Sequence, residues 1–204
     1  MARRLALALL LAGPALLAQS KSPRDLGPAS LLVASRDLAD PNFSKTVILL
    51  VHYDEESVLG LVLNRRTDVP ISRLFEGLKA AKGRVDPIYL GGPVEISTVF
   101  ALFQSPAKVE GAASIFDRIY LISRKTVLEQ TISARPDADS FHVYLGYAGW
   151  TNDQLRKEVA LGVWFIFQAD AAMVFDAEPN SLWSRMIRKA EQRLAANPGP
   201  RPAL

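Results

Sequence analysis

Short apolar runs separated by polar turns dominate the chain after residue 30, and their period indicates strands more often than helices. The run 46–52 is continuously apolar and β-branched, which is typical of a strand buried on both faces. The polar residues 54–57 between two of these runs predict a hairpin. The predicted strands are 31–34, 46–52, 58–63, 88–90, 98–103, 119–123, 141–145, 163–167 and 173–175.

Helical spacing of apolar residues is confined to four segments. The last of them, beginning near Asn180, has the clearest apolar stripe, and we expect Trp183 on it and Trp164 in the preceding strand to be largely buried. Strands outnumber helices and do not alternate regularly with them. This predicts an α+β protein: a single compact domain with a mixed, largely antiparallel and curled β-sheet flanked by helices. The predicted helices are 71–78, 126–133, 151–161 and the segment from Asn180.

The first twenty residues differ in composition from the rest. Arg3 and Arg4 precede an apolar run at 5–12, and small residues follow at 18–20, which is the pattern of a signal peptide. The mature protein is then expected to be periplasmic or secreted. The alternative is a start site assigned too far upstream and a cytoplasmic protein. The apolar run is too short to span a bilayer, so we expect no membrane span in the mature chain.

The expected organisation is a signal peptide at 1–20, a flexible arm at 21–30, a folded domain at 31–195 and a disordered tail at 196–204. The formal charge of +3 falls to +1 without the leader, because 22 basic residues then face 21 acidic ones. The basic residues near the C-terminus are typical of a solvated helix end and do not favour nucleic acid as a partner. With no cysteine, the chain has no disulfide or thiolate metal site.

Several separated motifs carry a resemblance to the AlgH/YqgE family. In order they are Leu31-Leu32-Val33-Ala34, 40–47, His52, 60–65, Gly91-Gly92-Pro93-Val94, 145–150, Gln154-Leu155 with Glu158, and Gly162 with Trp164. The resemblance implies a compact α+β domain without established catalytic residues, together with a transcriptional-regulator label. The chain departs from the family at Arg66, where relatives prefer proline, at Arg156, where they carry an acidic residue, and at Phe103, where they often carry histidine.

Catalytic and cofactor patterns are sparse. His52 with Asp54 or Glu55 could form a general base and its orienting partner, although no Gly-x-Ser-x-Gly elbow or cysteine supplies a nucleophile. A histidine that closes a hairpin is the alternative. His52 and His142 lack metal-ligand spacing, and the glycine clusters lack nucleotide-binding spacing, so no metal or cofactor is expected.

The remaining candidate is a groove beside two glycine-rich segments. Tyr147 and Trp150 combine apolar bodies with hydrogen-bonding tips, as residues in binding sites often do. An Arg65–Glu158 pair would suit a charged peptide or small ligand; the alternative is that both aromatic residues complete the core. We favour a non-enzymatic binding or interaction module for an unknown protein or small-molecule partner. The alternatives are a transcriptional regulator and a hydrolase using His52. The groove residues predicted are Asn64, Arg65, Gly91, Gly92, Pro93, Gly146, Tyr147, Gly149, Trp150, Gln154 and Glu158.

Overall fold

The structure is a computed structural model that describes residues 26–196. The predicted signal peptide (1–20), the first half of the predicted arm (21–25) and residues 197–204 of the predicted tail lie outside the described residues. The second half of the arm, residues 26–30, is packed against the domain. Leu26 joins an apolar cluster, and the amide of Ala29 donates a 3.0 Å hydrogen bond to the carbonyl of Leu50. The folded domain therefore begins several residues before 31.

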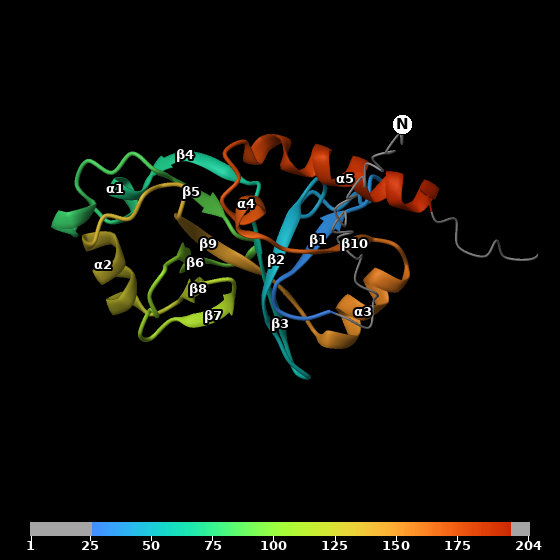
Figure 1. Cartoon of the computed structure of the whole chain (residues 1–204), viewed down its shortest axis with the longest axis horizontal. Helices are drawn as coiled ribbons and strands as arrows, with labels where there is room; N and C mark the ends of the chain where they lie inside the picture. The colour runs from blue at the N-terminus through green and yellow to red at the C-terminus, as the bar shows by residue number, and fades with distance from the viewer. Residues whose placement is uncertain (1–25, 197–204) are drawn as a thin grey trace, which may run out of the picture.

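Ten described strands form one curled sheet in the order β10-β1-β2-β3-β9-β6-β8-β7, with β5 beside β9 and β4 beside β5 (Figure 1). Every pairing is antiparallel except that of β5 with β9. The predicted α+β class with a mixed, largely antiparallel and curled sheet is confirmed. The strands are β1 (Ser30–Ala34), β2 (Val47–Tyr53), β3 (Val58–Val62), β4 (Arg66–Pro70), β5 (Pro87–Leu90), β6 (Val94–Gln104), β7 (Ala113–Phe116), β8 (Ile119–Ile122), β9 (Phe141–Trp150) and β10 (Trp164–Gln168).

Helices flank the sheet at three places. The long C-terminal helix α5 lies along β1, α3 lies beside β10, and α1 and α2 lie together at the other end (Figure 1). No helix of residues 26–196 is both long and apolar enough to cross a membrane. The helices are α1 (Ile71–Leu74), a 3-10 turn η2 (Lys79–Ala81), α2 (Lys125–Ser133), α3 (Asn152–Ala160), α4 (Ala171–Val174) and α5 (Pro179–Ala196).

The core consists of three apolar clusters that β9 connects. His142 and Tyr144 point to one face of β9, where Tyr144 joins the cluster beneath α5. Phe141 and Val143 point to the other face and join the cluster beneath α1 and α2. Trp150, at the far end of β9, belongs to the third cluster, beside α3. One strand with alternating side chains thus contributes to every part of the core.

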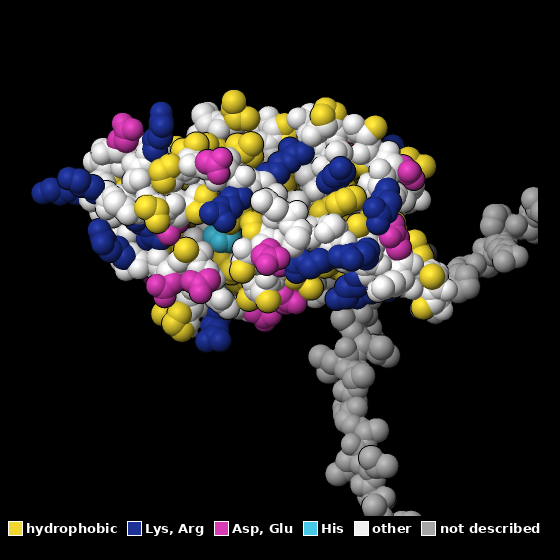
Figure 2. All heavy atoms as spheres, turned by 90° about the horizontal axis from the view of Figure 1, so that it is seen from above, with side chains coloured by type: hydrophobic (Ala, Val, Ile, Leu, Met, Phe, Trp, Pro, Cys, Tyr) yellow, Lys and Arg dark blue, Asp and Glu magenta, His cyan; other side chains and the backbone are white. Residues whose placement is uncertain are grey.

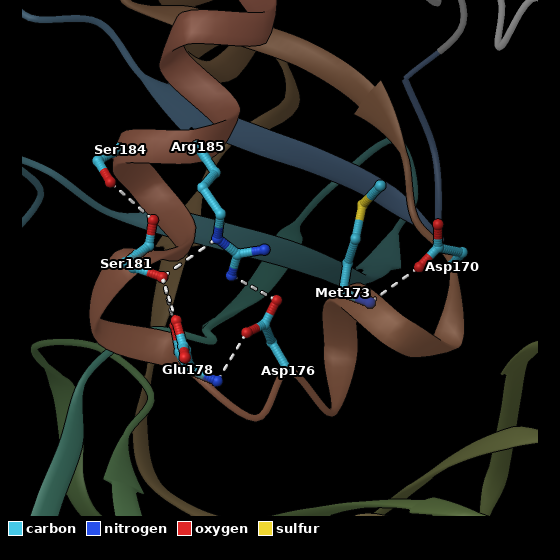
Figure 3. Close-up of polar contacts among 7 residues, drawn as sticks. All are labelled: Asp170, Met173, Asp176, Glu178, Ser181, Ser184 and Arg185. Carbon is cyan, nitrogen blue, oxygen red and sulfur yellow. Dashed lines mark hydrogen bonds and ion pairs between the residues drawn. The ribbon is translucent and has the colours of Figure 1, made fainter.

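The strands β4 and β7 were not predicted, and β6 begins four residues before the predicted strand 98–103. Three further predicted elements differ from the structure. The strand predicted at 141–145 continues to Trp150, because the glycine-rich segment keeps pairing with β3 and β6. The helix predicted at 71–78 ends at Leu74 and is followed by the 3-10 turn. The segment 173–175, predicted as a strand, contains the end of helix α4, whose N-cap Asp170 accepts a 2.8 Å hydrogen bond from the Met173 amide (Figure 3). Apolar runs this short fit either a strand or a helix, and the cap decided between them.

The two tryptophans expected in the core differ in burial. Trp164 is buried, with 3% of its surface exposed, which confirms that prediction. Trp183 is less completely buried than Trp164, but most of it is covered where it packs against two apolar clusters, which agrees with the prediction of large burial. Its indole reaches the C-terminal end of β1, where Nε1 donates a 2.8 Å hydrogen bond to the carbonyl of Ala34. A tryptophan bridging a helix to a strand end keeps part of its ring in solvent.

Candidate functional site

The two glycine-rich segments meet where the β5–β6 connection crosses β9. The Gly91 amide donates to the Leu145 carbonyl, and the Gly91 carbonyl accepts from Val62, both at 2.8 Å. Gly146 has a φ of +67°, and a Cβ there would lie 2.6 Å from the carbonyl oxygen of Gly92. A Cβ on Gly92 would fall on the backbone of Tyr147. These glycines therefore allow strand backbones to approach closely, and we call this place the glycine crossing.

The residues around the glycine crossing are divided between the surface and the core. Pro93 is exposed, and Gly149 lies opposite Leu59 in the β3–β9 ladder. Tyr147 is half-buried and packs edge-on against Phe100, with ring centroids 6.0 Å apart. The structure thus brings Gly91, Gly92, Gly146 and Tyr147 together, as the sequence predicted, but in a strand crossing rather than in turns.

A separate polar cluster lies between the end of β9 and α3 and consists of Trp150, Gln154 and Glu158. Oε2 of Glu158 accepts hydrogen bonds from the indole nitrogens of Trp150, at 3.0 Å, and Trp164, at 2.8 Å. Its Oε1 accepts from Nε2 of Gln154 at 2.9 Å. Phe43 stacks on Trp150 with centroids 5.8 Å apart. The carboxylate of Glu158 therefore satisfies two buried indoles, and this role holds α3 against the sheet.

Asn64 and Arg65 hold the loop before β2. The side chain of Asn64 accepts from the Val47 amide at 2.8 Å and donates to the Lys45 carbonyl at 2.9 Å. Arg65 donates to the Pro41 carbonyl at 2.9 Å, and burial lowers its pKa. The Arg65–Glu158 pair suggested by the sequence does not form, because the carboxylate oxygens of Glu158 accept from the α3 cluster instead.

His52 lies at the end of β2 with its side chain 50% exposed. Its Nε2 is 2.7 Å from Oδ2 of Asp54, while Oδ1 of Asp54 accepts from the amides of Glu56 and Ser57. Those amide hydrogen bonds are the main cause of the lowered pKa of Asp54. In a serine triad the histidine lies between the acid and the nucleophile. Here Asp54 lies between the ring of His52 and the amides of Glu56 and Ser57. This geometry matches the hairpin-closing interpretation.

Among the cavities of residues 26–196 that lie outside the predicted groove residues, two are lined in part by residues of the core clusters. The larger, about 690 Å³, lies between the α1–η2 segment, β6 and the N-terminal half of α2. We call it the apolar groove. Its lining residues are Leu74, Phe75, Gly77, Leu78, Thr98, Val99, Ser123, Lys125, Leu128 and Glu129.

The smaller cavity, about 270 Å³, lies on the opposite face of β5 and β9, against the α4–α5 connection. We call it the histidine cleft. His142 stacks on Tyr89 with ring centroids 4.5 Å apart, and burial lowers its pKa from 6.5 to about 4. Burial also raises the pKa of Tyr89. Its lining residues are Arg66, Asp86, Pro87, Tyr89, Ala138, Asp139, His142, Phe175, Asp176 and Ala177.

Sequence reasoning missed most of the residues that line these two cavities. One signal was present: His142 and Tyr144 place two polar-tipped side chains on the same face of an otherwise apolar strand. The partners of that face come from β4 and from the α4–α5 connection, far away in the sequence. Their convergence depends on the strand order.

Comparisons with known proteins place the chain beside uncharacterised bacterial relatives. The profile of the AlgH-like family matches residues 31–195. A UPF0301 protein from Streptomyces avermitilis is 35% identical over 168 residues, covering 81% of this chain and 87% of that protein. One from Chlorobium limicola is 31% identical over 182 residues, covering 88% and 96%.

Two solved structures share the fold. The solution structure of the AlgH protein from Pseudomonas aeruginosa has a TM-score of 0.67 and 28% identity, covering 91% of this chain and all of that chain. The crystal structure of a protein from Corynebacterium diphtheriae has a TM-score of 0.69 at 20% identity, covering 81% and 87%. The similarity therefore extends over nearly all of the described domain.

Proposed function

The chain belongs to the AlgH-like family, and on that premise we propose that it is a non-enzymatic interaction module that binds an apolar segment of a partner protein. The proposed binding surface is the apolar groove together with the glycine crossing beside it. The observation that carries the proposal is an open cavity of about 690 Å³ over one face of the sheet, in which apolar side chains of α1, β6 and α2 lie beside polar and charged ones. Binding cavities typically measure about 300–1,000 Å³ and are lined mainly by apolar side chains.

The apolar groove leaves part of one core cluster accessible to solvent. Leu74, Phe75, Leu78 and Val99 pack on the cluster beneath α1 and α2 but are themselves only partly buried. The helix α1 ends after a single turn, so it does not cover this part of the sheet fully. Contiguous apolar surface of this kind marks interaction sites in soluble proteins.

A row of side chains links the apolar groove to the glycine crossing. Leu145, the residue before Gly146, lies opposite Val99 on β6 and beside Leu90 on β5. Leu90 is 46% exposed, and Ile96, whose Cα lies against the Gly146 position, is 70% exposed. The groove predicted from the sequence beside these glycines therefore continues into the apolar groove in this proposal.

The rim of the apolar groove carries opposite charges. Lys125 and Glu129 lie one helical turn apart on α2, with their charged atoms 3.8 Å apart. Such a weak, exposed pair costs little to separate, so either group is free to contact a polar flank of the partner segment. A charged rim around an apolar floor is the usual composition of a protein-binding surface.

No observation on the described residues favours the two alternative functions. The face shown in Figure 2 carries basic and acidic side chains interspersed, whereas nucleic-acid binding calls for a basic face. For a hydrolase, His52 makes its one described side-chain hydrogen bond to Asp54, and no hydroxyl among residues 26–196 bonds to its ring.

A photo-crosslinking amino acid at Thr98, inside the apolar groove, tests the proposal in the native host. The matched control carries it at Thr126, an exposed residue on α2 that does not line the groove. We expect a protein cross-linked from Thr98 and not from Thr126. Identical products from both positions would contradict the assignment of the surface.

Binding of the purified cross-linked protein then tests the mechanism. Ser123→Arg places a bulky charge on the groove wall and should weaken binding by about tenfold or more, whereas Thr126→Arg should leave it unchanged. Equal affinities for the two variants would refute the groove as the binding surface. Native mass spectrometry that finds an apolar small molecule bound, with no protein cross-link, would contradict the choice of a protein partner.

A further inference from the structure

We propose that the histidine cleft is a second binding site, independent of the apolar groove, for a small zwitterion: a free α-amino acid with an apolar side chain. The cleft and the apolar groove lie on opposite faces of β5 and β9. Tyr89 and Tyr144 belong to the core cluster on the cleft side, whereas Ile88 and Val143 belong to the cluster beneath the groove. Binding at one site can therefore be tested without disturbing the other.

The floor of the histidine cleft is fixed by strand register. Arg66 on β4 lies directly opposite Tyr89 on β5, and Tyr89 lies beside Tyr144 on β9. Directly opposed residues project to the same face of a sheet, and so do residues two apart on one strand, which adds His142. Nδ1 of His142 is 3.5 Å from the Tyr144 hydroxyl. Arg66, Tyr89 and His142, from three strands, therefore face the cleft together, and Tyr144 lies buried behind them.

Three polar groups of the cleft have no partner of their own among the described residues. The guanidinium of Arg66 and the carboxylate of Asp139 make no hydrogen bond or ion pair there, and both residues are exposed at the rim. The hydroxyl of Tyr89 also makes no hydrogen bond within residues 26–196, although only 3% of Tyr89 is exposed. The hydroxyl opens to the cleft, because the only buried side-chain atom without a partner in residues 26–196 is a nitrogen of Arg84. A ligand in the cleft would accept its hydrogen bond in place of water.

The other carboxylates of the cleft are already paired. Asp86 forms an ion pair with the buried Arg84. Asp176 accepts from Arg185 at 2.6 Å and from the Glu178 amide at 2.8 Å (Figure 3). Among the described residues that line the cleft, Arg66 and Asp139 thus remain as the one cationic and the one anionic group for a ligand.

The imidazole of His142 adds no net charge to the cleft at neutral pH. It is 9% exposed, and it packs edge-on against Phe175 as well as stacking on Tyr89. Burial is the main cause of its pKa of about 4, and the nearby charge of Arg66 lowers that pKa further. Because the imidazole is neutral, recognition of charge is left to Arg66 and Asp139, which both line the cleft.

These groups define the ligand by its chemistry. Arg66 and the Tyr89 hydroxyl both donate hydrogen bonds and suit a carboxylate, while Asp139 suits an ammonium group. The ring of Phe175 and the body of Pro87 form apolar walls for a side chain. A volume of about 270 Å³ limits the ligand to roughly the size of one amino acid.

Calorimetric titration of the full-length protein with each of the twenty free amino acids tests the proposal, with L-phenylalanine and L-leucine as the leading probes. For any amino acid that binds, we expect its amide and its N-acetyl derivative to bind at least about tenfold more weakly, because each lacks one of the two charges. Equal binding of either derivative would refute zwitterion recognition. Absence of binding by all twenty at millimolar concentration would refute the site.

Substitutions assign the charges to residues. Arg66→Gln and Asp139→Asn should each weaken binding about tenfold or more, and Tyr89→Phe by a smaller factor. Arg66 and Asp139 are exposed, so their variants should fold normally. Arg73→Gln and Asp68→Asn, which are also exposed but lie outside the cleft, are the matched controls. Binding that survives both cleft substitutions, or that is lost equally in the controls, would overturn the proposal.

Discussion

Glu158 should be among the most sensitive polar positions of the domain, because one carboxylate satisfies two buried indoles. Trp150 and Trp164 are 6% and 3% exposed, and both indole nitrogens donate to the same Oε2 atom. Glu158→Ala would remove that acceptor without giving the indoles another partner. Glu158→Gln keeps one oxygen that can take the place of Oε2, and its amide nitrogen can donate to the side-chain oxygen of Gln154.

The magnitude follows from the cost of unsatisfied buried donors. A buried donor left without a partner costs about 1–3 kcal/mol, and a hydrogen bond to a charged group contributes about 1.5–3 kcal/mol. Two indoles lose such bonds in Glu158→Ala, so we expect the free energy of unfolding to fall by about 3–5 kcal/mol. Glu158→Gln replaces charged acceptors by neutral ones and should cost about 1–2 kcal/mol.

Urea denaturation followed by tryptophan fluorescence measures both variants, because the affected indoles are themselves the reporters. Lys157→Ala, an exposed change on the same helix, is the control and should stay within about 0.5 kcal/mol of the wild type. A cost below about 1 kcal/mol for Glu158→Ala would refute the reasoning, since it would mean that the indoles do not depend on this carboxylate.

Three further predictions address backbone strain, pH and helix docking. Gly146→Ala should lower the free energy of unfolding, measured by chemical denaturation, by about 2–4 kcal/mol, because φ is positive there and the added Cβ would lie 2.6 and 2.9 Å from two carbonyl oxygens. Gly27→Ala, with open space around the added Cβ, is the control and should be nearly neutral. His142 binds a proton more readily in the unfolded chain than in the folded one, so its contribution to stability is complete above pH 6.5 and is lost as the pH falls toward 4. The loss should be about 3 kcal/mol, and His142→Gln should remove it from the pH dependence of unfolding. Trp183→Ala should lower the free energy of unfolding by about 2–3 kcal/mol, less than for a fully buried tryptophan, because part of its ring is exposed although its indole bonds to Ala34. A cost near zero would show that α5 is held by its other contacts alone.

The sequence determined most of the local structure. The apolar run that became β2, the hairpin into β3 and the capped helix α3 all follow from local residue patterns, since period and turn chemistry are properties of neighbouring residues. Thr151 rather than Asn152 or Asp153 is the N-cap of α3, a shift of one or two residues. The family motifs were equally local, and the match to residues 31–195 confirms the family they indicated.

Tertiary structure decided what the glycine-rich segments and the polar residues do. Gly91 and Gly146 are 55 positions apart in the sequence, and only the crossing of the β5–β6 connection over β9 explains why neither tolerates a Cβ. Glu158 was expected to pair with Arg65, but the packing of α3 places it between two indoles. The histidine cleft needs β4, β5, β9 and the α4–α5 connection at once. Contacts between distant segments depend on strand order, which a local hydrophobic pattern does not encode, whereas the strands themselves are encoded locally.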